Sequence, residues 1–454
     1  MAFFTVFHGT LIHSLSLTQL EIINDGLLVV DQQGVIVQLE RDVKDVEVIV
    51  SSLSGSCKVH RLEPHQFLLP GFVDTHAHAP QFVFAGSGMD LPLLEWLNTY
   101  VFHVESKFQL AEYAERCYTK VVSRFLKNGT TTCSWFATIH LQACQILVDV
   151  VERLGQRAYV GKVNMDQNSP DYYIESTEAS LRDSRAFIEY TQNKSSLVTP
   201  VITPRFAITC SSELMKGLAA LAKEYDVPIQ THLCETLNEI DFTLSLFPDS
   251  KNYTAVYDDH GLLNDKAYMA HCVHMKDEEI ALLAERNTGV SHCANSNFSL
   301  HSGVCDVRRF IDKGLKVGLG TDVAGGFSPS ILDAVRSSFI ASKTVKIMQQ
   351  ENKSRIGEKE YTPLNPAELL YLATLGGAKV LGLQDTIGNF AVGKSFDALW
   401  VDLAEDGPVD LIGHETKQQM LEKFLFIGND QALLHIFVQG RRVAGKAATT
   451  TISA

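Results

Sequence analysis

Two histidines separated by a single residue, His76 and His78, lie within the segment Phe72–Gln81. Residues i and i+2 of a β-strand point to the same face, so both imidazoles would lie on one side of a strand. Neutral imidazoles this close together suit a divalent metal ion. Two ordinary buried histidines at a polar strand end would give the same pattern, so the pair alone does not decide between a ligand pair and a structural pair.

Three further residues of metal-ligand type follow at the ends of later apolar segments: His232, His271 and Asp322. If each segment is a strand of one parallel barrel, the carboxyl ends of the strands converge and bring these side chains together. A single strand ending in histidine is commonplace, whereas agreement among four strands is hard to explain by structure alone. The sequence therefore predicts a metal site at this end of the strands.

A carboxylate and one more histidine accompany these residues. Glu235 lies three residues after His232, where it would face the same cavity and could act as a general acid or base. His292 also closes an apolar segment. For His292 we favour the interpretation of a hydrogen-bonded histidine behind the ligands.

Eight apolar segments that read as strands alternate with amphipathic helices from Phe72 onward. This alternation is typical of a parallel sheet with crossover helices, and eight units indicate an α/β fold of the (β/α)8 barrel type. The predicted strands are Phe72–His78, Thr131–Ala137, Arg157–Val163, Val201–Thr203, Pro228–His232, Tyr268–His271, Gly289–His292 and Val317–Gly320. The predicted helices include Leu110–Lys127, Ser212 to about Tyr225, Ser330–Met348 and Pro366 to Gly382.

Both ends of the chain read as short strands outside the barrel. They are Phe3–Ile12, Leu27–Val30, Val35–Leu39 and Val46–Val50 at the start, and Phe396–Val401 and His435–Val438 near the end. Since the two sets resemble each other in length and alternation, we predict one small β-sandwich built from both termini. The predicted organisation is residues 1–70 and 388–454 as the two parts of the sandwich, with a tail, and 71–387 as the metal-dependent barrel.

Composition narrows the class of protein. Of 454 residues, 39 are basic and 53 acidic, and the net charge of −14 disfavours a nucleic-acid partner. No Lys or Arg precedes Arg41, and no apolar run is long enough to span a membrane, so we expect neither a targeting segment nor a membrane anchor. Nine scattered cysteines without a C-x-x-C pair argue against a disulfide framework. These features indicate a cytoplasmic enzyme.

Several motifs resemble those of the metal-dependent amidohydrolase superfamily, over nearly the whole chain. The segment Pro70–His78 resembles its first-strand motif, and Gly320-Thr321-Asp322 resembles its eighth-strand motif. Similarity to the guanine deaminases of animal and fungal type is closer still, and it lies in Leu93–Leu97, Pro204–Phe206, Ala373–Gly377 and Ile387–Phe390.

The resemblance implies hydrolysis of guanine to xanthine and ammonia by a homodimer. It implies one Zn²⁺ per chain, although the same ligands would also hold iron; the ligands would be His76, His78, His232 and Asp322. It further implies that His271 hydrogen-bonds the water on the metal or the substrate. The purine would be held by Gln81, Arg205 and Phe206, with Trp96 beside them.

Three positions depart from the family pattern without removing a ligand. Ala294 and His103 stand where proline is common, and Cys234 stands where serine is common. These departures affect loop geometry and substrate affinity rather than chemistry. The unrelated zinc deaminase fold carries H-x-E followed by P-C-x-x-C, and that combination does not occur in this sequence.

The ring-binding residues have chemistry that suits guanine. A guanidinium only donates hydrogen bonds, so Arg205 complements O6 of guanine and disfavours the amino group of adenine. Gln81 both donates and accepts, as the edge bearing N3 and the 2-amino group requires. In an alternative interpretation, Arg205 pairs with a loop carboxylate and Gln81 is a solvated loop residue.

The predicted chemistry needs two proton carriers. Asp322 would accept a proton as water attacks, and Glu235 would protonate ring N3 and then the departing amine. Two other functions stay open from the sequence. One is a ring aminohydrolase acting on adenine, a pterin, 8-oxoguanine or a triazine, and the other is a non-catalytic scaffold protein.

Overall fold

Strands from both ends of the chain form one eight-stranded sheet. The computed structural model describes residues 2–351, 360–404 and 407–446, so the predicted tail, Thr449–Ala454, lies outside the described residues. The strand order is β18-β17-β16-β5-β1-β2-β3, with β4 beside β1. The strands are β1 Ala2–Ser16, β2 Gln19–Val30, β3 Ile36–Glu40, β4 Gly55–Arg61, β5 Gln66–Pro70, β16 Ala398–Asp402, β17 Leu433–Val438 and β18 Arg441–Ala444.

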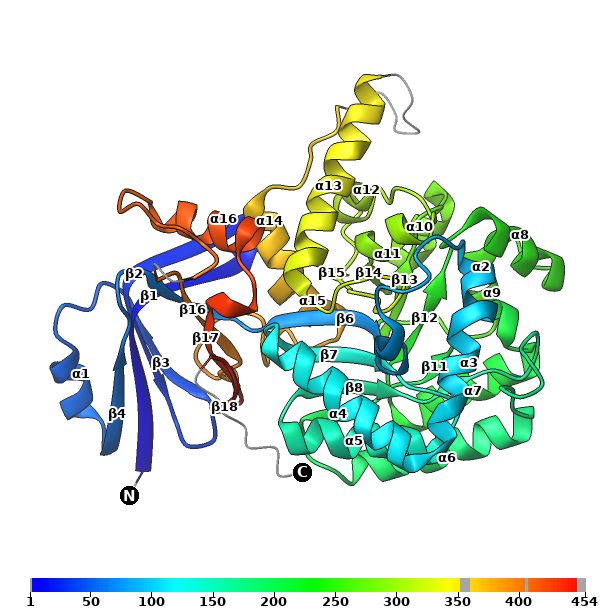
Figure 1. The fold of residues 1–454 in the computed structure, drawn as a ribbon, viewed down its shortest axis with the longest axis horizontal. Helices are drawn as coiled ribbons and strands as arrows, with labels where there is room; N and C mark the ends of the chain where they lie inside the picture. The colour runs from blue at the N-terminus through cyan, green and yellow to red at the C-terminus, as the bar shows by residue number, and fades with distance from the viewer. Residues whose placement is uncertain (1, 352–359, 405–406, 447–454) are drawn as a thin grey trace.

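The two termini meet where β5 pairs antiparallel with β16, from Gln66 opposite Asp402 to Pro70 opposite Ala398. Figure 1 shows these strands together at one end of the molecule, beside the remaining strands and helices. The predicted pairing of the two ends is therefore confirmed. All eight strands belong to one sheet, so the two facing layers of a sandwich stay a prediction.

The segment Val46–Val50 is a helix, and the predicted strand there is wrong. Helix α1 spans Val46–Ser52, and the Asp45 side chain caps it by accepting a hydrogen bond from the backbone N–H of Glu47. Val46, Ile49 and Val50 pack with Val6 and its neighbours in the sheet, whereas Val48 is exposed. Their i, i+3, i+4 spacing makes one helix face apolar, and this packing overrides the strand preference of β-branched residues.

Ten parallel strand segments account for the eight predicted strands. They form the sheets β10-β8-β7-β6, β11-β9 and β12-β13-β14-β15. Their bounds are β6 Phe72–His78, β7 Thr130–Phe136, β8 Arg157–Gly161, β9 Val163–Asn164, β10 Val198–Pro200, β11 Thr203–Pro204, β12 Ile229–Leu233, β13 Ala267–His271, β14 Gly289–His292 and β15 Val317–Leu319. The predicted strand Arg157–Val163 is interrupted between β8 and β9, and the predicted strand Val201–Thr203 falls largely in the gap between β10 and β11.

Backbone contacts join these sheets to one another. An isolated parallel bridge pairs Ile202, between β10 and β11, with Ile229 of β12. Beyond β15, the N–H of Asp322 donates to the carbonyl of His76 at 2.8 Å, and the N–H of His78 donates to the carbonyl of Val323 at 2.9 Å. The end of β6 therefore lies beside the segment that follows β15, although the two are separated by more than half the chain.

Helices follow most of the parallel strands, as the alternating pattern predicts. Helix α7 begins after Ser211, whose hydroxyl accepts from the N–H of Leu214. The described helices from α4 onward are α4 Ala111–Lys127, α5 Leu141–Leu154, α6 Thr177–Gln192, η4 Ala207–Thr209, α7 Ser212–Tyr225, α8 Leu237–Leu246, α9 Tyr253–Asp259, α10 Asp277–Glu285, α11 Ala294–Ser299, α12 Val307–Asp312, α13 Ile331–Gln350, α14 Pro366–Tyr371, η5 Leu372–Gly376, α15 Gly377–Val380, α16 Lys417–Ile427 and η6 Asp430–Ala432. Among the described residues, no helix combines the length and hydropathy needed to cross a membrane.

A series of short helices connects β6 to α4. It comprises η1 Ala79–Phe84, α2 Leu93–Trp96, the π-helix η2 Leu97–Val101, α3 Phe102–Glu105 and η3 Ser106–Gln109. A π-helical turn changes which side chains face inward, and such turns are frequent at functional sites. Trp96, Phe102 and Glu105 are all buried along this segment.

Candidate metal centre and active site

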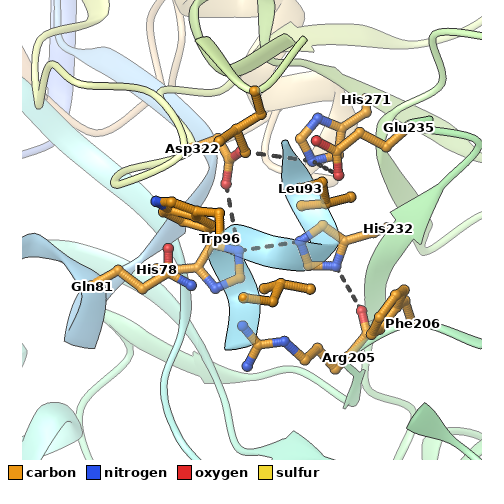
Figure 2. A pocket seen from close by; sticks show the side chains of 12 residues that line it. His78, Gln81, Leu93, Trp96, Arg205, Phe206, His232, Glu235, His271 and Asp322 are labelled. Carbon is orange, nitrogen blue, oxygen red and sulfur yellow. Dashed lines mark hydrogen bonds and ion pairs between the residues drawn. The ribbon is translucent and has the colours of Figure 1, made fainter. Parts of the chain in front are cut away.

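The ends of four strands bring five side chains together, as the sequence predicts. Figure 2 shows His78, His232 and Asp322 converging on one point. Nε2 of His78 lies 3.1 Å from Nε2 of His232, and Oδ1 of Asp322 lies 3.0 Å from Nε2 of His76 and 3.4 Å from Nε2 of His78. All of these side chains are almost completely buried except that of His232, which is partly buried.

The cluster has the donor set of a metal site. Ligand atoms of His76, His232, His271 and Asp322 lie within 4.8 Å of one another. Nε2 of His271 is buried and forms no hydrogen bond to any described residue, and buried Nε2 of His76 meets only the carboxylate of Asp322. Buried polar atoms are rarely left unsatisfied. A divalent cation beside His76 would satisfy the imidazole of that residue, and a water or ligand in the site would satisfy that of His271.

Protonation states in the cluster also fit a cation. Burial lowers the pKa of His76, His78 and His232, which favours the neutral imidazole. Burial alone would raise the pKa of Asp322, but the adjacent imidazoles, His76 first, hold that pKa below its usual range. Neutral imidazoles and an ionised carboxylate are the forms that bind a divalent metal.

Asp74 positions the segment that carries Asp322. Its carboxylate accepts hydrogen bonds from the N–H and the hydroxyl of Thr321, at 3.1 and 2.6 Å, and from the N–H of His76. Asp74 is not among the site residues that the sequence predicts. Its place two residues before His76, on the same face of β6, is the signal that would have identified it.

His271 lies between two carboxylates. Its Nε2 is 3.5 Å from Oε2 of Glu235 and 3.7 Å from Oδ2 of Asp322, and its Nδ1 is 2.9 Å from Oδ1 of Asn297. Burial opposes a charge on the ring, but the two carboxylates outweigh it and raise the pKa of His271. His271 and Asp322 also have left-handed backbones, with φ of 70° and 46°, a conformation that is concentrated at functional sites.

Glu235 is suited to carry a proton. Burial raises its pKa to about 7, and the hydroxyl of Ser302 donates to its Oε1 at 2.9 Å. A carboxyl group with a pKa near neutrality can both hold and release a proton. The neighbouring Glu239 has a different task, because its carboxylate accepts from the backbone N–H groups of Glu235 and Thr236 and from the hydroxyl of Tyr253.

A cavity opens directly over this cluster, and all four predicted substrate-binding residues line it: Gln81, Trp96, Arg205 and Phe206. Leu93, Leu97 and Leu300 complete its apolar wall. The sequence motif around Trp96 contains two of these leucines, whereas no local signal marks Leu300. The indole Nε1 of Trp96 is buried without a hydrogen-bond partner among the described residues, so it remains available as a donor to a ligand.

The structure corrects the alternative interpretation of the ring-binding residues. Gln81 is buried rather than solvated, its Nε2 donates to Oε1 of Glu105 at 3.0 Å, and its Oε1 accepts from the N–H of Ala324 at 3.1 Å. Arg205 does form an ion pair, at 2.6 and 3.2 Å, but the carboxylate is that of Glu105 in helix α3. Arg205 still lines the cavity while making this pair.

His292 differs from its prediction. Both ring nitrogens are buried and have no hydrogen-bond partner among the described residues, so the predicted hydrogen-bonded histidine is wrong in that respect. Burial lowers its pKa to about 4.

Of the positions that depart from the family pattern, His103 stacks on Tyr172 with the ring centroids 5.2 Å apart. Cys234 is buried with a φ of 51°.

Comparison with known proteins identifies the family of this chain. The model of the amidohydrolase family matches residues 67–443. A guanine deaminase from Dictyostelium discoideum is 42% identical over 96% of this chain and 98% of its own length. The guanine deaminase of Rattus norvegicus is 43% identical over 96% of each chain. The chain belongs to the amidohydrolase family and, within it, to the guanine deaminases.

The fold matches solved members of the guanine deaminase family. The guanine deaminase of C. acetobutylicum, crystallised with guanine bound in its active site, superimposes with a TM-score of 0.89 at 35% identity. The match covers 97% of this chain and all of that one. Family membership therefore extends over the terminal sheet as well as over the strands that carry the cluster.

Proposed function

We propose that this protein hydrolyses guanine to xanthine and ammonia. One observation carries the proposal: a metal-type cluster, the proton carrier Glu235 and the donor Arg205 line or underlie a single cavity. Membership of the guanine deaminase family supports the choice of substrate.

His76, His78, His232 and Asp322 would hold one divalent ion, Zn²⁺ or iron, at the floor of the cavity. When bound, such an ion makes hydroxide available near neutral pH by lowering the pKa of water from about 15.7 to about 7. His271 lies outside this ligand set in the proposal, and it hydrogen-bonds the attacking water or the substrate.

The substrate ring is held by the walls of the cavity. Arg205 donates to O6, which excludes the amino group that adenine carries at that carbon. Gln81 meets the edge with N3 and the 2-amino group, and Phe206 stacks on the ring. Trp96 contributes a further donor through its unpartnered Nε1.

Protons then move between two carboxylates of this chain. Asp322 accepts a proton from the attacking water, and Glu235 delivers one to N3 of the ring. When the C2–N bond breaks, Glu235 takes the proton that the new C2 hydroxyl loses and passes it to the leaving amine, which departs as ammonia. The proton on Asp322 then returns to Glu235 and restores both carboxyl groups to their starting forms. The pKa of about 7 for Glu235 lets one group serve both transfers.

We also propose how the chain is divided into a barrel and a smaller β domain, and how two chains assemble. The parallel strands close into a (β/α)8 barrel over residues 71–387, supported by the Ile202–Ile229 bridge and the contacts of β6 with the segment after β15. Residues 1–70 and 388–454 make the smaller β domain. Two chains form a homodimer, and the enzyme works in the cytoplasm on a small-molecule substrate and water.

Ammonia release from purines tests this function. Guanine should be deaminated far faster than adenine, and Arg205→Ala should lower kcat/KM for guanine by about ten- to a hundredfold, as expected for loss of a charged hydrogen bond. The exposed Arg182 provides a matched control, since Arg182→Ala should leave kcat/KM unchanged. Faster turnover of adenine, or full activity in Arg205→Ala, would replace this assignment with another ring aminohydrolase.

A further inference from the structure

A single buried carboxylate, that of Glu105, joins the polar side chains that line the ring-binding wall. Its Oε2 accepts from NH1 of Arg205 at 2.6 Å and from the hydroxyl of Tyr173 at 2.8 Å. Its Oε1 accepts from NH2 of Arg205 at 3.2 Å and from Nε2 of Gln81 at 3.0 Å. Glu105 is completely buried and does not line the cavity itself, so it acts on a ligand only through these partners.

Helix α3, which carries Glu105, makes a second contact with the guanidinium of Arg205. Its Cζ lies 5.3 Å from the ring centroid of Phe102, which is three residues before Glu105 in α3. Positions i and i+3 share one helix face, so α3 presents an aromatic ring and a carboxylate to one guanidinium. A bidentate ion pair together with a cation–π contact leaves the guanidinium little freedom to turn.

Arg205 and Gln81 both keep free hydrogen-bonding groups for a ligand. Arg205 has five N–H groups, and Glu105 engages two of them. Gln81 directs one amide N–H at Glu105 and accepts from Ala324 N–H with its oxygen, which fixes the orientation of its amide. One N–H and one lone pair of Gln81 are then left for the substrate.

The Arg205–Glu105 ion pair also determines the net charge of the cavity wall. The positive charge of Arg205 and the negative charge of Glu105 cancel within the wall of the cavity. A neutral wall with oriented donors favours an uncharged ring that carries a carbonyl oxygen. An unpaired guanidinium would instead favour an anion.

We infer that Glu105 is a positioning residue that orients Arg205 and Gln81 and keeps the ring-binding wall neutral, so that the cavity selects an uncharged oxopurine over an anionic one. This inference rests on the proposed deamination of guanine and adds to it a basis for substrate selection. No atom of Glu105 takes part in the chemistry.

The isosteric change Glu105→Gln tests the inference, because it removes the charge and keeps the volume. Binding of guanine and of urate, a purine that is anionic near neutral pH, should be measured in metal-loaded protein that carries Glu235→Gln, with and without Glu105→Gln, because active enzyme would consume the guanine. We expect the Kd for guanine to rise about ten- to a hundredfold, and the Kd for urate to fall by about threefold or more. In turnover, the loss should lie mainly in KM rather than in kcat.

Two further variants separate a loss of positioning in the cavity wall from a general loss of folding stability. Tyr173→Phe removes one neutral donor to Glu105 and keeps the ion pair, so it should weaken guanine binding only severalfold and leave the preference against urate intact. Asp397→Asn breaks another buried, bidentate arginine–carboxylate pair, with Arg157, away from the cavity. It should lower thermal stability without changing either Kd.

The outcomes distinguish the inference from the function on which it rests. Wild-type enzyme that binds guanine without releasing ammonia would reject the proposed deamination alone. An unchanged ratio of the guanine and urate Kd values in Glu105→Gln would reject the role of Glu105, even with full turnover in the wild type. Equal weakening of guanine and urate binding is one such result, because it describes a merely structural residue.

Discussion

At the scale of single residues, the metal-type cluster combines convergence with protonation states suited to binding. Burial favours the neutral imidazoles of His76, His78 and His232, and they face the ionised carboxylate of Asp322. Apart from that carboxylate, Nε2 of His76 has no partner among the described residues. Since the ligands come from β6, β12 and the segment after β15, the loss of any one leaves an incomplete site.

We therefore predict one divalent ion per chain. Alanine replacement of a ligand should abolish turnover and reduce bound metal; the four positions are His76, His78, His232 and Asp322. The exposed His414 serves as the control, since His414→Ala should keep both metal and activity. Elemental analysis with two ions per chain, or full activity after complete chelation, would contradict the single-ion site.

Glu235 is the residue whose change should separate chemistry from binding. In Glu235→Gln the proton carrier is lost while the cluster and the cavity wall remain, so kcat should fall by about 10² to 10⁴ with metal content retained. Glu278→Gln, a change at a half-exposed carboxylate in α10, should have no effect on kcat. Near-normal kcat in Glu235→Gln would move the proton transfers to another group.

At the scale of elements, the helical segment after β6 performs two tasks. Leu93, Trp96 and Leu97 form part of the cavity wall, and Phe102 and Glu105 hold Arg205 from behind. The π-helical turn η2 begins at Leu97 and ends directly before Phe102, so it joins the two groups. One connection therefore shapes the cavity and orients its donors.

In the terminal sheet, His13 of β1 ties three segments together. Its Nδ1 accepts from the N–H of Phe390 at 3.3 Å, which leaves Nε2 as the donor to Oε2 of Glu21 in β2, at 2.9 Å. Burial lowers the pKa of His13 from 6.5 to about 4, because protonation would place a charge in the core and remove the acceptor for Phe390.

This shift predicts a loss of stability in acid. The unfolded chain binds a proton at His13 below its pKa of 6.5, and the folded chain does so only near 4, so folding stability falls as the pH drops through that interval. The contribution is about 3 kcal/mol when the interval has been crossed. Urea unfolding of the metal-loaded protein at pH values above and below this interval would measure it.

His13→Gln keeps an acceptor and a donor but cannot titrate. Its free energy of unfolding should therefore depend less on pH than that of the wild type, although the variant is less stable near neutrality. The same pH dependence in both proteins would assign the acid sensitivity to other groups.

At the scale of the whole molecule, the sheet from both termini ties the chain ends together. Antiparallel pairing of β5 and β16 joins residues more than 300 positions apart, and the ion pair between Arg157 of β8 and Asp397 links that sheet to the parallel strands. Arg157 is the first residue of β8, so this link lies at the opposite end of the parallel strands from the carboxyl ends that carry the cluster. Figure 1 shows the terminal sheet beside the parallel strands.

The proposed homodimer is tested at this scale. Light scattering of the purified protein should give a mass near twice the 50.2 kDa of one chain, without change over a tenfold dilution. A mass near 50.2 kDa at working concentration would contradict the dimer.

The sequence by itself determined the strands and the residues at their ends. The bounds of β6 and β14 agree with prediction to the residue, and the other parallel segments lie within a few residues of it. Short apolar segments flanked by amphipathic helices encode this order locally. The convergence of His76, His232, His271 and Asp322 then follows from the rule that parallel strands share a carboxyl edge.

Only the tertiary structure decided which side chains support these residues. Glu105 and Arg205 are 100 positions apart, and neither lies in a pattern that names the other. The helix at Val46–Ser52 likewise depends on packing against the sheet rather than on its own β-branched residues. Local periodicity records which face of an element is apolar, whereas the partner of a buried charge is set by how distant elements pack, and that information is absent from any single stretch of chain.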